Sequence, residues 1–112
     1  MAVAVLALAG CVGAPVGPVS WGACSDTPQP DGYNCTELHG DSVGAATYQA
    51  QCERNGGIYS DACPPGANPG CCTQGPDADG LTQITCSYNC TDTVCADLPA
   101  VCTANRGVWS SR

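Results

Sequence analysis

The sequence predicts a small disulfide-rich α+β domain, in which short helices are each followed by a β-hairpin or a strand. Three observations support this fold class. The chain has eleven cysteines in 112 residues, it contains no phenylalanine and only 5% aromatic residues, and a short motif with cysteine and glycine occurs twice. Cysteine at about a tenth of a short chain is typical of disulfide scaffolds.

Large apolar side chains are too scarce for packing alone to hold this chain together. It contains 14 glycines and nine prolines, and ordering each residue costs roughly 1–2 kcal/mol. A disulfide contributes about 2–4 kcal/mol, mainly by restricting the unfolded chain. Because disulfides persist in oxidising compartments, we expect a secreted protein or one of the cell envelope, periplasmic or on the cell surface.

The repeated motif reads C-x-x-N-x-G-[IV]-[YW]-S and occupies residues 52–60 and 102–110. A helix that ends in a Schellman motif favours glycine at C′, where the backbone turns left-handed, and an apolar residue at C″. We therefore expect Gly57 and Gly107 at C′. In this interpretation the next residue packs on the cysteine of the motif, and the chain continues as a strand.

The N-terminal part of the chain is predicted to be a leader. Residues 1–10 are apolar without interruption, which fits the core of an export signal and is too short to span a bilayer. No basic residue precedes this run, because the first arginine is Arg54. We assign residues 1–23 to an export signal and linker, and residues 24–112 to a disulfide-stapled repeat domain.

The apolar run ends in Leu8-Ala9-Gly10-Cys11, which resembles the lipobox of bacterial lipoprotein precursors. The resemblance implies that Cys11 is lipidated and forms the first residue of the mature chain. Conventional cleavage further along would instead discard Cys11. In either case an even number of cysteines remains, enough for five bridges.

Ten cysteines are therefore disulfide candidates, and the sequence leaves their connectivity open. Neighbouring Cα atoms are too close for an ordinary bridge, and side chains alternate between the two faces of a strand. Cys71 and Cys72 should thus have different partners. The candidates are Cys24, Cys35, Cys52, Cys63, Cys71, Cys72, Cys86, Cys90, Cys95 and Cys102.

Within the domain we expect repeat units at about residues 42–90 and 91–112, and a partial unit at residues 19–41. A helix should run from an N-cap at Ser42 or Asp41 to about Asn55. Residues 71–74 and 81–88 should form a hairpin. A last helical region should begin near residue 91 and break at Pro99, which is tolerated in a first turn but not inside a helix.

Ten acidic residues face three arginines and no lysine, for a formal charge of −7. Binding to phosphate backbones or anionic lipid needs clustered basic residues. We therefore expect no nucleic-acid partner, and membrane attachment only through a lipid on Cys11. We expect the acidic surface to keep the protein soluble, because a net charge far from zero opposes association.

No metal or cofactor site is expected. The chain has no C-x-x-C pair of the kind that zinc sites use. His39 is the one histidine and is expected in a solvated loop. Asp77-x-Asp79-Gly80 resembles part of a calcium loop but lacks the further oxygen ligands at fixed offsets, so a plain turn is expected.

Three aromatic residues, Trp21, Tyr59 and Trp109, stand at matching places in the proposed units. They are the candidates for an aromatic binding platform, and we expect them to form the small core instead. No nucleophile with a partner base and no nucleotide-binding fingerprint is found. The sequence therefore predicts no catalytic residues.

The repeated motif, with Cys63-Pro64 and Gly70-Cys71-Cys72-Thr73 between its copies, resembles cysteine-rich tandem-repeat proteins of bacteria that are predicted to be exported or lipoproteins. The resemblance covers about residues 42–112 and implies a location and an architecture, with no activity attached.

We expect a non-enzymatic exported module, a structural or adhesive element of the cell envelope or extracellular space, with an unknown protein or surface as partner. The alternative is a small secreted binding protein, protease-inhibitor-like or toxin-like. It would present the loop Cys63–Gly70, whose three prolines would lower the entropy lost on binding.

Overall fold

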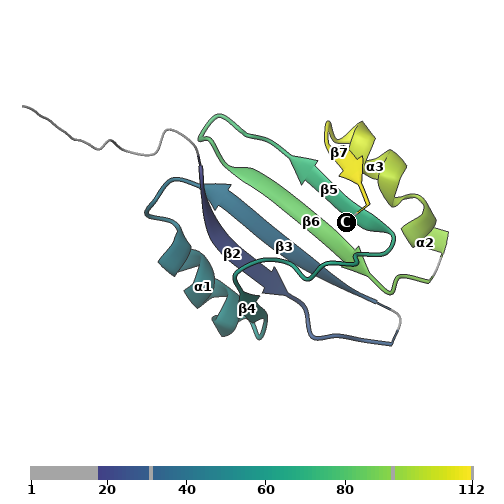
Figure 1. Cartoon of the computed structure of the whole chain (residues 1–112), viewed down its shortest axis with the longest axis horizontal. Helices are drawn as coiled ribbons and strands as arrows, with labels where there is room; N and C mark the ends of the chain where they lie inside the picture. The colour runs from purple at the N-terminus through teal and green to yellow at the C-terminus, as the bar shows by residue number, and fades with distance from the viewer. Residues whose placement is uncertain (1–17, 31, 92, 112) are drawn as a thin grey trace, which may run out of the picture.

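The computed structural model describes residues 18–30, 32–91 and 93–111. The leader and Cys11 lie outside these residues. The described chain forms a small disulfide-rich α+β domain, as predicted, and its strands make up one antiparallel sheet (Figure 1). Its elements are β2 (Val19–Ser25), β3 (Tyr33–Gly40), α1 (Ala45–Arg54), β4 (Ile58–Ser60), β5 (Gly70–Gln74), β6 (Thr82–Tyr88), α2 (Thr93–Ala96), α3 (Leu98–Ala104) and β7 (Val108–Ser110).

The sheet has six strands in the order β4-β2-β3-β6-β5-β7. Two hairpins, β2–β3 and β5–β6, are joined at the centre by the antiparallel pair β3–β6. Each hairpin is followed by a helical segment and then by a three-residue edge strand that pairs with the first strand of that hairpin. The order of elements is therefore the same from either edge of the sheet (Figure 1).

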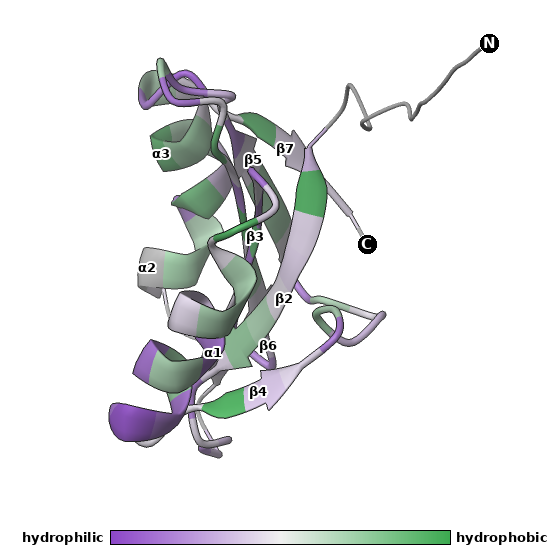
Figure 2. Cartoon of the chain, turned by 90° about the vertical axis from the view of Figure 1, so that its left-hand side faces the viewer, coloured by the Kyte–Doolittle hydropathy of each residue, from purple (hydrophilic) through white to green (hydrophobic). Residues whose placement is uncertain are grey.

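One row of paired residues crosses all six strands. Residues directly opposite one another in a sheet share a face, and two cysteines of this row, Cys24 and Cys72, are bonded to helix residues Cys52 and Cys102. The row therefore faces the helices, which lie on the same side of the sheet (Figure 2). From edge to edge it consists of Tyr59, Cys24, Thr36, Thr85, Cys72 and Trp109.

All ten cysteines of the described residues are paired. Cys71 and Cys72 have different partners, as their adjacency predicted. Two bridges fasten helices to the sheet, one fastens the segment after β4, one joins β5 to β6, and one closes the start of α2 onto the end of β6. The pairs are Cys24–Cys52, Cys35–Cys63, Cys71–Cys86, Cys72–Cys102 and Cys90–Cys95.

The buried core lies on the face of the sheet that the helices do not cover. It contains one large side chain, Tyr88, on which the ring of Tyr33 stacks at 4.8 Å. The remaining members are half-cystines and alanines, so four of the seven core residues are half-cystines. The core residues are Ala23, Cys35, Cys63, Ala67, Cys71, Cys86 and Tyr88.

The expectation that Trp21, Tyr59 and Trp109 form the core is wrong. All three are only half buried, and Tyr59 and Trp109 belong to the row under the helices. The reason is geometric. Strand side chains alternate between faces, and the register of the short edge strands turns the rings of Tyr59 and Trp109 toward the helices and away from the core of half-cystines.

Both predicted helix ends are Schellman motifs, one residue out of the predicted register. The left-handed C′ residues are Gly56 and Arg106, with φ of 80° and 64°. The N–H of Gly57 donates to the Cys52 carbonyl, and the N–H of Gly107 donates to the Cys102 carbonyl, each at 2.8 Å. The motif glycines are therefore at C″, not at C′.

Glycine is required at C″ because a disulfide passes over it. A Cβ at Gly57 would lie 2.5 Å from the sulfur of Cys24, and one at Gly107 would lie 2.5 Å from the sulfur of Cys72. These sulfurs belong to the two bridges that hold α1 and α3 on the sheet. The C-x4-G spacing thus records the close approach of a cystine to the end of each helix.

The start of α1 also differs from the prediction. The N-cap is Gly44, and no side chain caps it. Asp41 instead accepts a hydrogen bond from the N–H of Val43 at 3.0 Å. The N-cap must be glycine, because a Cβ at Gly44 would overlap the ring of Trp21.

The interrupted last helix is confirmed. α2 ends at Ala96, and α3 begins at Leu98 with Pro99 in its first turn. The predicted hairpin of residues 71–74 and 81–88 is observed as β5–β6. The expected unit boundaries near residues 42 and 91 fall between β3 and α1 and between β6 and α2.

Replacing Gly57 by alanine should destabilise the oxidised protein by about 1–3 kcal/mol, because the added methyl collides with the Cys24–Cys52 bridge. The matched control is Gly56→Asn. A side chain at Gly56 meets open space, and asparagine accepts the left-handed backbone at a cost of about 1 kcal/mol or less. Denaturant unfolding measures both. Equal losses for the two variants would contradict the role assigned to Gly57.

Candidate functional site

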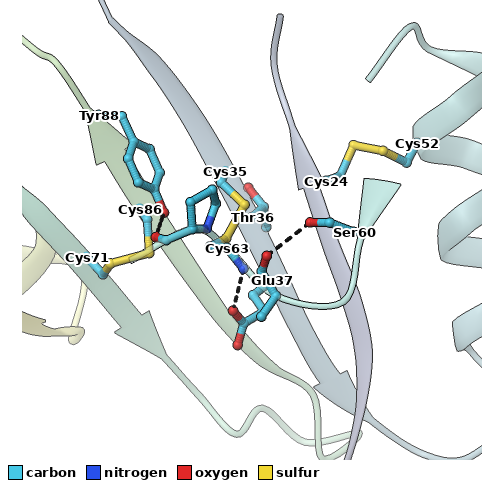
Figure 3. Close-up of a disulfide and its surroundings, with 12 residues drawn as sticks. Cys24, Cys35, Thr36, Glu37, Cys52, Ser60, Cys63, Cys71, Cys86 and Tyr88 are labelled. Atoms are coloured by element: carbon cyan, nitrogen blue, oxygen red, sulfur yellow. Dashed lines mark hydrogen bonds between the residues drawn. A yellow bond between two sulfur atoms is a disulfide. The ribbon is translucent and has the colours of Figure 1, made fainter. Parts of the chain in front are cut away.

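The loop Cys63–Gly70, singled out by its prolines, is fixed to the sheet at several points. Cys63 is bonded to Cys35, and its N–H donates to the carboxylate of Glu37 at 3.0 Å. The hydroxyl of Tyr88 donates to the carbonyl of Pro64 at 2.6 Å. Figure 3 shows these contacts around the Cys35–Cys63 bridge.

The middle of the loop covers the core. Ala67 is buried among the core residues, whereas Pro64, Pro65, Gly66 and Asn68 are exposed. The loop therefore closes the face of the sheet that the helices leave open, and only a short tip is available to a partner.

Glu37 and His39 form a pair that the sequence did not predict. His39 lies in strand β3 and not in a solvated loop, and its Nε2 is 2.9 Å from the Glu37 carboxylate. Glu37 is only 4% exposed, and its other oxygen accepts the Cys63 N–H. The sequence signal for this strand was the alternation of side chains in residues 33–40, in which Glu37 shares a face with Tyr33 and Cys35.

The aromatic residues under α1 form a connected cluster. The ring centroid of Tyr48 lies 6.5 Å from those of Trp21 and Tyr59. The Tyr48 hydroxyl donates to the carbonyl of Thr36 in the central strand β3, and the Tyr59 hydroxyl donates to the carbonyl of Trp21. Burial raises the pKa of the Tyr48 phenol, an effect that a hydrogen bond with the Cys24 backbone opposes in part.

A hollow of about 200 Å³ lies between α3 and the sheet. We name it the α3 hollow. Its wall is mostly apolar, formed by the Cys72–Cys102 bridge, two aliphatic residues of α3 and one indole ring. Its lining residues are Cys72, Gln74, Thr85, Ser87, Leu98, Val101, Cys102, Asn105 and Trp109.

The α1 side has a hollow of a different kind. It measures about 320 Å³ and lies between Trp21 and the start of α1. Tyr48 forms part of its wall, and the sheet cysteine and threonine of that side do not line it. Trp21 of β2 and Leu38 of β3 also line it, so this hollow reaches the sheet next to Tyr48 and away from Cys24 and Thr36.

In the acidic turn after β5, the carboxylate of Asp77 is hydrogen-bonded to backbone N–H groups of the turn itself. Asp77 accepts hydrogen bonds from the N–H groups of Asp79 and Leu81, at 2.9 and 3.0 Å. Within residues 18–30, 32–91 and 93–111, no group of three or more His, Cys, Asp or Glu side chains is placed to hold a metal ion. None of the helices described is long and apolar enough to cross a membrane.

Comparison with known proteins adds no relative. No family model, no curated protein and no solved structure matches this chain.

Tyr48→Phe should lower the unfolding free energy at neutral pH by about 1 kcal/mol, because it removes the hydrogen bond to Thr36. It should also change the alkaline limb of stability. Because the folded-state pKa of Tyr48 is raised above its ordinary value of about 10, the phenol contributes stability that is present below about pH 10 and is lost as the pH rises from there through the raised folded-state pKa. The free energy of unfolding, measured from about pH 8 to pH 12, should therefore decrease less steeply with pH for the variant than for the parent. Superimposable slopes would contradict this contribution.

Glu37→Ala should lower the free energy of unfolding by about 1–3 kcal/mol more than Glu37→Gln does. Alanine leaves the buried N–H of Cys63 without its acceptor, whereas glutamine retains a carbonyl oxygen at that place. Thermal or denaturant unfolding of the two oxidised variants measures the difference. If the variants are equally stable, the bond between Glu37 and the Cys63 N–H does not hold the loop in place.

Proposed function

We propose that the protein is a non-enzymatic disulfide-stapled module that acts in the extracellular space or cell envelope as a structural or adhesive element. The observation that carries this proposal is the composition of the core, in which half-cystines take the place of large apolar side chains. A domain of this kind depends on its disulfides, and disulfides of this density persist in oxidising compartments.

We also propose that the module consists of two related halves, residues 19–60 and 70–110, in place of the units expected from the sequence. Each half has a hairpin, a helical segment and an edge strand. In each, a cysteine of the first strand is bonded to a cysteine of the helix. The register supports a two-fold relation through the central pair Thr36–Thr85, because the row across the sheet reads aromatic, Cys, Thr in both directions.

The two halves share one sheet through β3 and β6, so they form a single module and not two independent repeats. Its edge strands have only three residues each. Such short edges give little template for further strand pairing. These features support a self-contained module whose partner is an unknown protein or surface, while the charge of −7 argues against nucleic acid.

The secreted-binder alternative needs the loop Cys63–Gly70 to be available to a target protein. Its buried anchors, Cys63 and Ala67, and the carbonyl of Pro64 are engaged with the core. This use of the loop favours the structural role over the inhibitor-like one.

The proposal is tested on protein purified from its native host. Fractionation should recover it outside the cytosol, and thiol titration with intact mass should find no free thiol among the ten cysteines from Cys24 to Cys102. Peptide mapping should recover the five observed bridges, and reduction should unfold the chain. A cytosolic protein with free or zinc-bound thiols would overturn the proposal.

A further inference from the structure

The α3 hollow lies where the other half of the sheet carries a tyrosine ring. Tyr48 and Leu98 occupy corresponding positions, since each precedes the bridged helix cysteine, Cys52 or Cys102, by four residues. α1 therefore presents a phenol to the sheet at the position where α3 presents a shorter aliphatic chain.

The surroundings of the Tyr48 ring recur in the other half. Tyr48 donates to the carbonyl of Thr36, and its ring packs against that of Tyr59. In the row across the sheet, Thr85 corresponds to Thr36 and Trp109 to Tyr59. Both Thr85 and Trp109 line the α3 hollow.

The disulfide beside the Tyr48 ring also has a counterpart in the other half. The Cys24–Cys52 bridge holds α1 beside Tyr48, and the corresponding Cys72–Cys102 bridge lines the α3 hollow. The receiving wall for a tyrosine ring is thus present on both sides, while only the α1 side supplies the ring from its own helix.

The size and chemistry of the α3 hollow suit a single aromatic ring. Its volume of about 200 Å³ exceeds the roughly 150 Å³ of an engineered apolar cavity that takes up benzene. Leu98, Val101 and the indole of Trp109 supply apolar contacts. At the rim, Gln74 and Asn105 are joined by a hydrogen bond from the Gln74 amide to the Asn105 carbonyl at 3.2 Å, which fixes a polar edge.

We propose that the α3 hollow binds the phenolic ring of a tyrosyl group, with its hydroxyl directed to the backbone of Thr85 as that of Tyr48 is directed to Thr36. This goes beyond a structural or adhesive role, because it assigns the module a ligand chemistry. The same chemistry occurs in a free phenol and in a tyrosine side chain on a peptide, and the experiment distinguishes these two sources.

The probes are p-cresol, which is the tyrosine side chain alone, and N-acetyl-tyrosinamide, which adds peptide groups. Two-dimensional NMR of ¹⁵N-labelled oxidised protein should show shifts of the Trp109 indole N–H and of the Gln74 and Asn105 amides. The Trp21 indole N–H, which donates to the Asp41 carbonyl, is the internal control and should not move. Toluene, which lacks the hydroxyl, should bind several-fold more weakly than p-cresol.

Leu98→Tyr should fill the α3 hollow from within, as Tyr48 does under α1, and reduce affinity for p-cresol at least tenfold. Ile58→Tyr adds the same side chain at a position that is 51% exposed on the other half, and it should bind p-cresol as the parent does. Should Leu98→Tyr fail to fold, Val101→Phe narrows the same hollow from a helix position that is 50% exposed.

Binding of both probes supports a peptide-borne tyrosyl group as the ligand, and binding of p-cresol alone supports a free phenol. The proposal is overturned if neither probe shifts the Trp109 indole, or if the filling variants keep the parent affinity. Because these readouts do not depend on where the protein is located, they can fail or succeed independently of the proposed extracellular role.

Discussion

The whole structure depends on the contact between a cystine and the end of a helix. In each half, a strand cysteine reaches under the helix to its partner, and the sulfur lies so close to the following backbone that only glycine fits at Gly57 and Gly107. The helix cannot move along the sheet without breaking this contact. Two such contacts position α1 and α3, and with them the aromatic rings beneath.

On the opposite face, sulfur takes the place of an aliphatic core. Cys35, Cys71 and Cys86 are fully buried side by side on adjacent strands, and the segment after β4 is bonded over them through Cys63 (Figure 3). A disulfide restricts the unfolded chain as well as filling space. This explains how a domain with one large side chain in its core can order six strands.

Because the two halves share the same arrangement of strands, helix and disulfide, the residues that differ between them indicate where their properties differ. Arg106 has the left-handed backbone that Gly56 takes in the other half, where a side chain would meet open space. Leu98 in place of Tyr48 changes more, since it removes a ring from beside the sheet and coincides with the α3 hollow. The shared cysteines and glycines hold each helix on the sheet, whereas the helix residues that face the sheet determine what each half can bind.

Part of the fold could be predicted because its causes are local. Pro99 cannot lie inside a helix, and it divides α2 from α3. The adjacent cysteines, Cys71 and Cys72, point to opposite faces of a strand, and their partners are on different elements. The turn residues between β5 and β6 marked the hairpin. The strand β3 and its Glu37–His39 pair were missed, because a buried carboxylate is stabilised there by the N–H of Cys63, far away in the sequence.

The sequence by itself determined that this is a disulfide-held α+β domain with helices ending at a repeated motif, because cysteine content, proline and glycine act within a few residues. Only the tertiary structure decided which cysteines pair, why the motif glycine stands at C″, and that the aromatic rings lie under the helices. These features depend on the strand register and on the path of each bridge, which join residues that are distant in the chain. The α3 hollow also depends on tertiary structure, since it lies where α3 meets the strands β5, β6 and β7.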